Sequence, residues 1–359
     1  MTILDRYVLK EYVRNFSLIL CALMTVYIIV DFFERVRMFL SNNATIGHIL
    51  SYLLYNIPMI LVLMLPITVL LASLVTFTIL TRNNEVTAMK ANGLSLYRVS
   101  ASLIAAAIVA SLAIFLLNEF VTPRTNRKVK HIRYIEVQKR ESMGTFKKNE
   151  IWYRGQNGIY NFGIFDPLTG TIQGIKINYL DDHMKLVKRI DARRAAWEKD
   201  RWVFYDILVT TFDEKRRPLL QKLASAIVDI PESPEDLSVV QKGADEMGYF
   251  ELLRYIAKIR SEGFDASRYL PDLYGKISFP FVTIILTMLG IAFSVRSERS
   301  GGIFRSLGIG IVIGLSYWII FGFSLSLGRS GSIPPAVAAW AANSLFGAAA
   351  LALFCRVKT

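Results

Sequence analysis

The chain has 359 residues, 53% of them hydrophobic, and a mean hydropathy of +0.38. This composition indicates a membrane protein, and the length allows two domains. The net charge of +13 is spread along the chain without a lysine-rich tail, so it favours contacts with anionic lipid over nucleic-acid binding. Cys21 and Cys355 lie far apart in apolar runs, and we therefore assign no disulfide.

The N-terminal half contains three apolar runs that are long enough to span a membrane. These predicted spans cover residues 16–33, 49–80 and 99–118 of a half that comprises residues 1–122. Arg6, Lys10 and Arg14 precede the first run at i, i+4 and i+8, which suits either an interfacial helix or a solvated helix face. No small-residue cleavage site follows, so the first run is a retained span. Pro58 and Pro66 predict a kink in the second.

The middle of the chain, residues 123–248, is polar and changes its periodicity. Tyr160, Phe162 and Ile164 alternate with polar or small residues, and Gly, Asp and Asn separate this run from similar ones. Short alternating runs with frequent turn residues predict an antiparallel sandwich or a related all-β fold.

The C-terminal half, residues 249–359, returns to the membrane. A helical stretch over 249–262 leads into predicted spans over 277–295, 306–327 and 335–355. The predicted fold is therefore an α-helical membrane protein with six transmembrane helices and an all-β domain inserted between the third and fourth.

The basic residues of the short connecting segments predict the orientation. One side carries eleven of them, namely Arg6, Lys10, Arg14, Arg82, Lys90, Arg98, Arg296, Arg299, Arg305, Arg356 and Lys358, and the other side carries three, Arg35, Arg37 and Arg329. Both termini are thus expected inside the cell. In a bacterium the β-domain would then lie in the periplasm.

Catalytic chemistry finds no support in the sequence. A nucleotide-binding loop is absent, and His48, His131 and His183 are too far apart to suggest a metal site. The glycines at 308, 310 and 314 lie within an apolar span, where small residues usually allow close helix packing. The predicted spans carry no charge at their middle, which counts against a secondary transporter. If the chain transports anything, the energy comes from another protein.

A short segment over 82–93, between the second and third spans, is the candidate contact with such a protein. One helical face would carry the residues at i, i+3, i+4 and i+7, and a glycine would end the helix. The candidate coupling residues are Glu85, Ala88, Met89, Ala91, Asn92 and Gly93. An exposed Met beside small alanines could enter a partner groove, with the glutamate as a charged anchor. A loop helix lying on the membrane is the alternative.

Three segments resemble one known family. Glu85-Val-Thr-Ala-Met-Lys-Ala-Asn-Gly93 resembles the E-x-x-x-M-x-A-x-G segment of the lipopolysaccharide-export permeases, which are the paired F-type and G-type subunits of an ABC transporter. The opening Leu4-Asp5-Arg6-Tyr7 and the segment Tyr269–Lys276 resemble that family too, and the opening looks more like the G-type. The resemblance covers essentially the whole chain.

The resemblance implies a set of partners. The chain would pair with a homologous permease subunit as a heterodimer, and two copies of a cytoplasmic ATPase would bind it. The segment matching Glu85–Gly93 would be the coupling helix in the ATPase groove. Lipopolysaccharide would enter from the outer leaflet of the inner membrane and pass through jellyroll-like β-domains to a periplasmic bridge. ATP would be held by the partner, so this chain itself would need no cofactor.

The resemblance also implies basic residues that meet the phosphorylated head group near the outer ends of the spans. The candidates are Arg35, Arg37, Arg124, Arg127 and Lys128, and arginine forks suit phosphate oxygens. Ordinary interfacial anchoring is the alternative. Asp31 and Glu34 stand among these cations, whereas G-type subunits often place a basic residue in the outer part of the first span.

The sequence thus predicts a non-catalytic permease subunit for lipopolysaccharide export. A membrane-anchored scaffold whose β-domain only binds a periplasmic partner is the rival, and it would need no coupling helix. A secondary transporter is a weaker alternative because charges at the middle of the membrane are missing.

Overall fold

The computed structural model divides the chain into two compact units, one formed by Met1–Ile132 with Ala244–Thr359 and the other by Arg133–Gly243. It describes residues 3–138, 144–147, 150–155, 158–166, 169–181, 185–198, 200–212, 217–230, 234, 237, 243–261, 265–296 and 303–356. Arg299 and Lys358 of the orientation count lie outside these residues.

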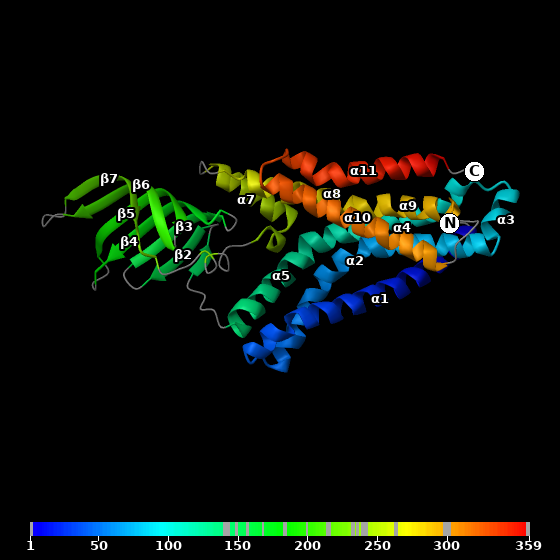
Figure 1. Cartoon of the computed structure of the whole chain (residues 1–359), viewed down its shortest axis with the longest axis horizontal. Helices are drawn as coiled ribbons and strands as arrows, with labels where there is room; N and C mark the ends of the chain where they lie inside the picture. The colour runs from blue at the N-terminus through cyan, green and yellow to red at the C-terminus, as the bar shows by residue number, and fades with distance from the viewer. Residues whose placement is uncertain are drawn as a thin grey trace. The chain divides into compact units, whose positions relative to one another are not determined.

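The first unit is a bundle of long helices (Figure 1). Its first half contains α1 (Ile3–Ser41), α2 (Ile46–Arg82), α3 (Glu85–Ala91), α4 (Leu96–Leu116), the π-helical η1 (Leu117–Val121) and α5 (Thr122–Lys130). The π-helical η2 (His131–Val137) begins in this unit and continues past its limit at Ile132. Its second half contains η3 (Ala244–Glu246), α7 (Tyr249–Ser261), η4 (Ser267–Tyr269), α8 (Leu270–Ser278), η5 (Phe279–Phe281), α9 (Val282–Arg296), α10 (Ile303–Arg329) and α11 (Pro335–Cys355).

Six helical runs in the described chain are long and apolar enough to cross a membrane, which confirms the predicted number. The most apolar stretch of α2 is 78% buried and that of α1 only 6%, so α2 forms the centre of the bundle and α1 its periphery. Both termini and α3 lie at the same end of the bundle (Figure 1). We call this the coupling end, and the opposite end, where α5 and α7 lie, the outer end.

The helices are more continuous than predicted. The expected interfacial helix and the first span form one helix, α1, and α2 passes Pro58 and Pro66 without ending. The predicted domain limits were 123 and 248, whereas the compact β unit covers Arg133–Gly243. Helical structure continues past the first limit because Pro123 occupies the first turn of α5, where proline needs no hydrogen-bond partner.

Polar side chains inside the bundle find partners on neighbouring helices. The Tyr317 hydroxyl donates to Asn343 Oδ1 at 2.8 Å, and Asn343 Nδ2 donates to the Ser278 carbonyl at 2.6 Å. These bonds connect α8, α10 and α11. In a membrane such pairing replaces the water that a buried amide would otherwise bind.

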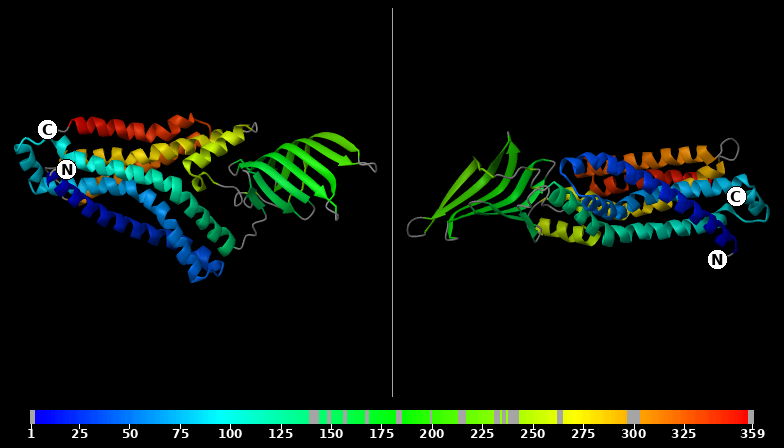
Figure 2. Two further views of the ribbon diagram at one scale, coloured as in Figure 1. Left: turned by 180° about the vertical axis from the view of Figure 1, so that it is seen from behind. Right: turned by 90° about the horizontal axis from the view of Figure 1, so that it is seen from below.

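The second unit contains one antiparallel sheet, which confirms the predicted all-β domain. Its strands are β1 (Gly144–Lys147), β2 (Glu150–Gly155), β3 (Gly158–Asp166), β4 (Thr171–Leu180), β5 (Leu186–Glu198), β6 (Arg201–Phe212) and β7 (Pro218–Ile227). Each strand pairs with the next along the chain, in the order β1 to β7. Figures 1 and 2 show a strongly curved sheet, which in the described residues is an up-and-down meander and not two stacked sheets.

An apolar core covers one face of this sheet. Phe162, Ile177 and Phe204 are fully buried on it, as the alternation predicts. Phe165 of β3 is buried in the same core. Gly174 of β4 has a φ of +69°, and the register of β3 with β4 is the same on both sides of it.

Close contact between α2 and α10 occurs at two glycines of α10, Gly310 and Gly314. A Cβ added at Gly310 would lie 2.5 Å from Leu71 Cδ2 and 2.7 Å from Leu74 Cδ1. Both leucines are buried. Gly308, two residues earlier on the same helix, has no atom within 4 Å of its added Cβ.

We therefore predict that Gly310→Leu lowers the unfolding free energy of the isolated chain in detergent by about 1–3 kcal/mol, since overpacking forces the neighbours from their rotamers. Gly308→Leu is the matched control and should leave stability near that of the wild type. Denaturant unfolding measures both. Equal unfolding curves for the two variants would contradict this packing role.

Candidate functional site

The predicted coupling segment forms a short helix, α3, between two defined ends. Asn84 precedes it in the left-handed conformation, with φ 60°. Gly93 follows it with φ +78°, and the Leu94 amide donates back to the Met89 carbonyl at 3.1 Å. Ser95 then caps α4 by accepting from the Arg98 amide. Gly93 therefore ends the helix as predicted, because glycine tolerates this backbone conformation without strain.

The exposed face of α3 differs from the predicted one. Val86 is buried, and Met89 is half-buried against a cluster that includes Phe77 and Leu80. Four side chains are exposed, those of Thr87, Ala88, Ala91 and Asn92. The expectation of an exposed methionine is wrong, because Met89 shares the side of α3 that packs on the chain's own core. The alanines and Asn92 are accessible as expected.

Glu85 is engaged within the chain. Asn83 Nδ2 donates to Glu85 Oε1 at 3.2 Å, and the Tyr7 side chain of α1 lies near the same carboxylate and interacts with it electrostatically. The glutamate therefore ties the start of α3 to α1. It remains half-exposed, which leaves part of the carboxylate open to a partner.

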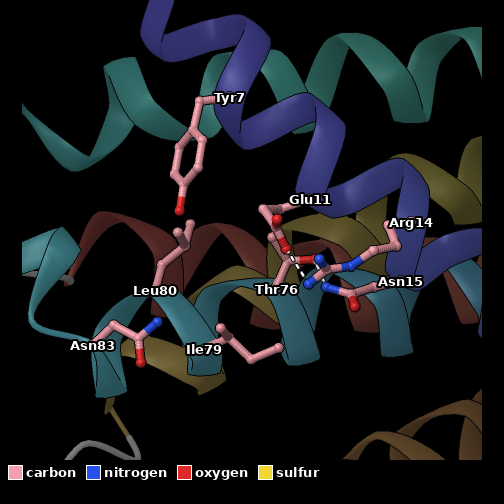
Figure 3. A pocket seen from close by; sticks show the side chains of 8 residues that line it. All are labelled: Tyr7, Glu11, Arg14, Asn15, Thr76, Ile79, Leu80 and Asn83. Atoms are coloured by element: carbon pink, nitrogen blue, oxygen red, sulfur yellow. Dashed lines mark hydrogen bonds and ion pairs between the residues drawn. The ribbon is translucent and has the colours of Figure 1, made fainter.

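A polar cavity of about 140 Å³ lies beside α3, between α1 and α2. Figure 3 shows its lining side chains, those of Tyr7, Glu11, Arg14, Asn15, Thr76, Ile79, Leu80 and Asn83. Arg14 pairs with Glu11 on the same helix, and Asn15 Nδ2 donates to Thr76 Oγ1 at 3.0 Å. The second bond connects α1 to α2 at this level of the bundle.

The two arginines predicted near the outer end of α1 have different environments. Arg35 Nε lies 2.8 Å from Asp31 Oδ1, and its guanidinium covers the Tyr52 ring at 5.6 Å. Asp31 is 4% exposed and also accepts from Asn56 Nδ2. Arg35 therefore compensates a buried carboxylate, whereas Arg37 is exposed. Asp31, one of the two acidic residues among these cations, therefore has a structural role.

The basic residues of α5 also divide into two kinds. Arg127 donates to the Glu246 carbonyl at 3.0 Å and lies 2.6 Å from Glu251 Oε2, so it fastens α5 to η3 and α7. Arg124 donates to the Phe120 carbonyl and is exposed. Lys128 is exposed as well. Of the five predicted head-group residues, Arg37, Arg124 and Lys128 are thus the accessible ones.

Two sets of polar contacts were not predicted. At the outer end, a Glu119 oxygen accepts from the Tyr249 amide, at the first residue of α7. At the coupling end, Arg98 forms a two-pronged pair with Asp5, with distances of 2.6 and 2.9 Å. The partners are far apart in the chain, so no spacing rule could find them. The only sequence signal was that Asp5 belongs to the opening segment quoted above.

A family model described as "Lipopolysaccharide export system permease LptF/LptG" matches residues 6–356. The chain belongs to this family. The lipopolysaccharide export system permease protein LptG of Escherichia coli K12 is 21% identical over 323 residues, which cover 89% of this chain and 87% of that protein. The LptG protein of Haemophilus influenzae is 22% identical over 322 residues, with 88% of each chain covered.

The family match includes every part described above: the six long helices, α3 and the inserted sheet. It confirms the resemblance drawn from the short segments around Glu85, at the N-terminus and over Tyr269–Lys276, which lies largely in α8. The permease family thus accounts for a chain with helices on both sides of a β-domain.

Proposed function

We propose that this chain is a permease subunit that moves lipopolysaccharide out of the inner membrane and passes it to a periplasmic bridge. One observation carries the proposal: six spanning helices and an inserted β-domain occur in a chain that the permease family matches from residue 6 to residue 356. A scaffold or a secondary transporter would not need this combination together with a docking helix between the second and third spans.

ATP binding and hydrolysis belong, in this proposal, to a cytoplasmic ATPase. Two copies of it would serve this chain and a homologous permease subunit. The support for contact here is local. The face of α3 formed by Thr87, Ala88, Ala91 and Asn92 is exposed and made of small side chains, so a groove can approach the helix backbone closely. The opposite face is held by the bundle, so a force on α3 reaches the membrane helices.

Ala88→Asp with Ala91→Asp tests the docking face. The double variant should weaken retention of the ATPase about tenfold or more, because desolvating an unpaired carboxylate costs well above the roughly 1.4 kcal/mol that corresponds to a tenfold change. Pull-down of the ATPase from detergent extracts measures this, and transport in reconstituted vesicles should fall with it. Ser330→Asp with Ser332→Asp, in the turn between α10 and α11, is the control. Wild-type retention by the α3 variant would show that α3 is only a loop helix.

Head-group binding would use the cations that are free to meet phosphate. Arg37, Arg124 and Lys128 are exposed at the outer end, whereas Arg35 and Arg127 neutralise acidic groups of the chain. Lipid phosphates have the charge and the acceptor oxygens that such side chains bind. The first three are therefore the contacts that we assign to the substrate.

Replacing Arg37, Arg124 and Lys128 together with Ala should reduce photo-crosslinking to lipopolysaccharide about tenfold, because each exposed ion pair contributes about 0.5 kcal/mol. The charge-matched control replaces Arg6, Lys10 and Arg356, which are exposed at the coupling end. It should retain crosslinking. Equal crosslinking by both triple variants would show that the outer cations are interfacial anchors.

Delivery would pass through the β-domain. Its buried aromatic and aliphatic face is suited to acyl chains. Among the described residues β7 pairs only with β6, and most of its side chains are exposed. Such an edge accepts a strand from another β-domain. We place this domain in the periplasm and both termini in the cytoplasm, on the strength of the basic residues at the coupling end.

A photo-crosslinking residue at Leu220 of β7 should form an adduct with the periplasmic bridge protein in intact cells. Leu220 is 67% exposed. The same residue at Val187, which is 51% exposed on the interior strand β5, should not. An adduct with a cytoplasmic protein from Leu220 would overturn the orientation, and equal adducts at both positions would overturn the edge assignment.

A further inference from the structure

The first turns of α1 are part of the coupling end. Asp5 is 8% exposed, although it carries a charge, and both of its carboxylate oxygens accept from Arg98 of α4. A buried carboxylate needs such a partner because its desolvation is otherwise uncompensated. The segment expected to lie on the membrane surface is therefore fixed to the helix that follows α3.

A second contact joins the same segment to α3 itself. Tyr7 lies near Glu85 and interacts with its carboxylate electrostatically, and Glu85 is the first residue of α3. Between these polar contacts the segment packs through apolar side chains. Val8 and Tyr12 of α1 belong to one buried cluster with Val86 of α3 and with Leu96 and Val99 of α4. The same cluster also contains residues of α2, α9 and α11, so α1, α3 and α4 belong to the common core at this end of the bundle.

A cavity interrupts the packing of α1 against α2 between Tyr7 and Asn15. The cavity of Figure 3 separates the two helices there, and the described bond that crosses its wall is the one from Asn15 to Thr76. A packed interface resists displacement, whereas a cavity leaves room for it. The start of α1 therefore shares a packed core with α2, α3 and α4, and the cavity leaves space on part of its α2 side.

We infer that residues 5–12 form a joint with α3 and the start of α4, and that Asp5 and Tyr7 are positioning residues through which displacement of α3 moves α1. This inference rests on the proposed function. It extends that function because it assigns the transmission of movement from α3 to α1, a helix that does not itself form the docking face for the ATPase. Since α1 continues without a break to Ser41, a shift at its first turns is carried along its length. Only 6% of its most apolar stretch is buried in the single chain, so little of this stretch is enclosed by the bundle.

The test measures ATP hydrolysed per lipopolysaccharide delivered by the whole complex in reconstituted vesicles. Asp5→Arg and Arg98→Asp should each raise this ratio about tenfold, the size of a typical coupling between sites, while the ATPase stays bound. The double charge swap restores the pair and should recover most of the coupling. Arg14→Ala removes an exposed pair from the same helix and should leave the ratio unchanged.

Tyr7→Phe is a milder variant that should fold normally, because it removes one hydroxyl and keeps the packing. It should also raise the ratio of ATP hydrolysed to lipopolysaccharide delivered, with unchanged ATPase retention. A wild-type ratio in Tyr7→Phe, or an unrecovered ratio in the charge swap, would overturn the joint. If the wild-type complex neither bound the ATPase nor delivered lipid, the proposed function itself would fail, and the two failures are thus distinct.

Discussion

The absence of water around six long helices is the constraint on which the rest of the membrane unit depends. Backbone groups satisfy each other within the helices, so the only polar groups left to pair are side chains. The structure pairs them across helices, as in Tyr317 with Asn343 and Asn15 with Thr76. At the two ends of the bundle, the pairs Asp5–Arg98 and Arg127–Glu251 join charged residues that are distant in sequence. Stability and function therefore share the same few polar contacts.

The same constraint explains what could be predicted. An apolar run that is long enough to cross a bilayer is compatible with a membrane-spanning helix and little else. The number of spans could therefore be predicted from the sequence. Alternation over Tyr160–Phe162 indicated a strand for a similar reason, since one face of the sheet packs against an apolar core. The C-terminal end of α3 could also be predicted, because Gly93 has a backbone conformation that few other residues adopt.

The orientation of side chains in the site could not be read in this way. Helical spacing placed Met89 on one face with Glu85 but could not tell whether that face met solvent or the bundle. Burial of Val86 decided it. In the same manner, Arg127 looked like a ligand for phosphate until Glu251 appeared beside it. Its partner lies 124 positions further along the chain, and only the fold brings the two together.

The π-helical turn at Leu117–Val121 has a consequence for helical phase. A π-turn accommodates an extra residue within a helix, and one residue corresponds to a rotation of about 100° around the axis. The helix that follows this turn, α5, is thereby rotated about the helix axis relative to α4. Glu119 lies within it and meets the first amide of α7, and Asn126 and Arg127 reach Asp245 and Glu246 from the rotated part. The extra residue of the π-turn thus sets which face of α5 contacts η3 and α7.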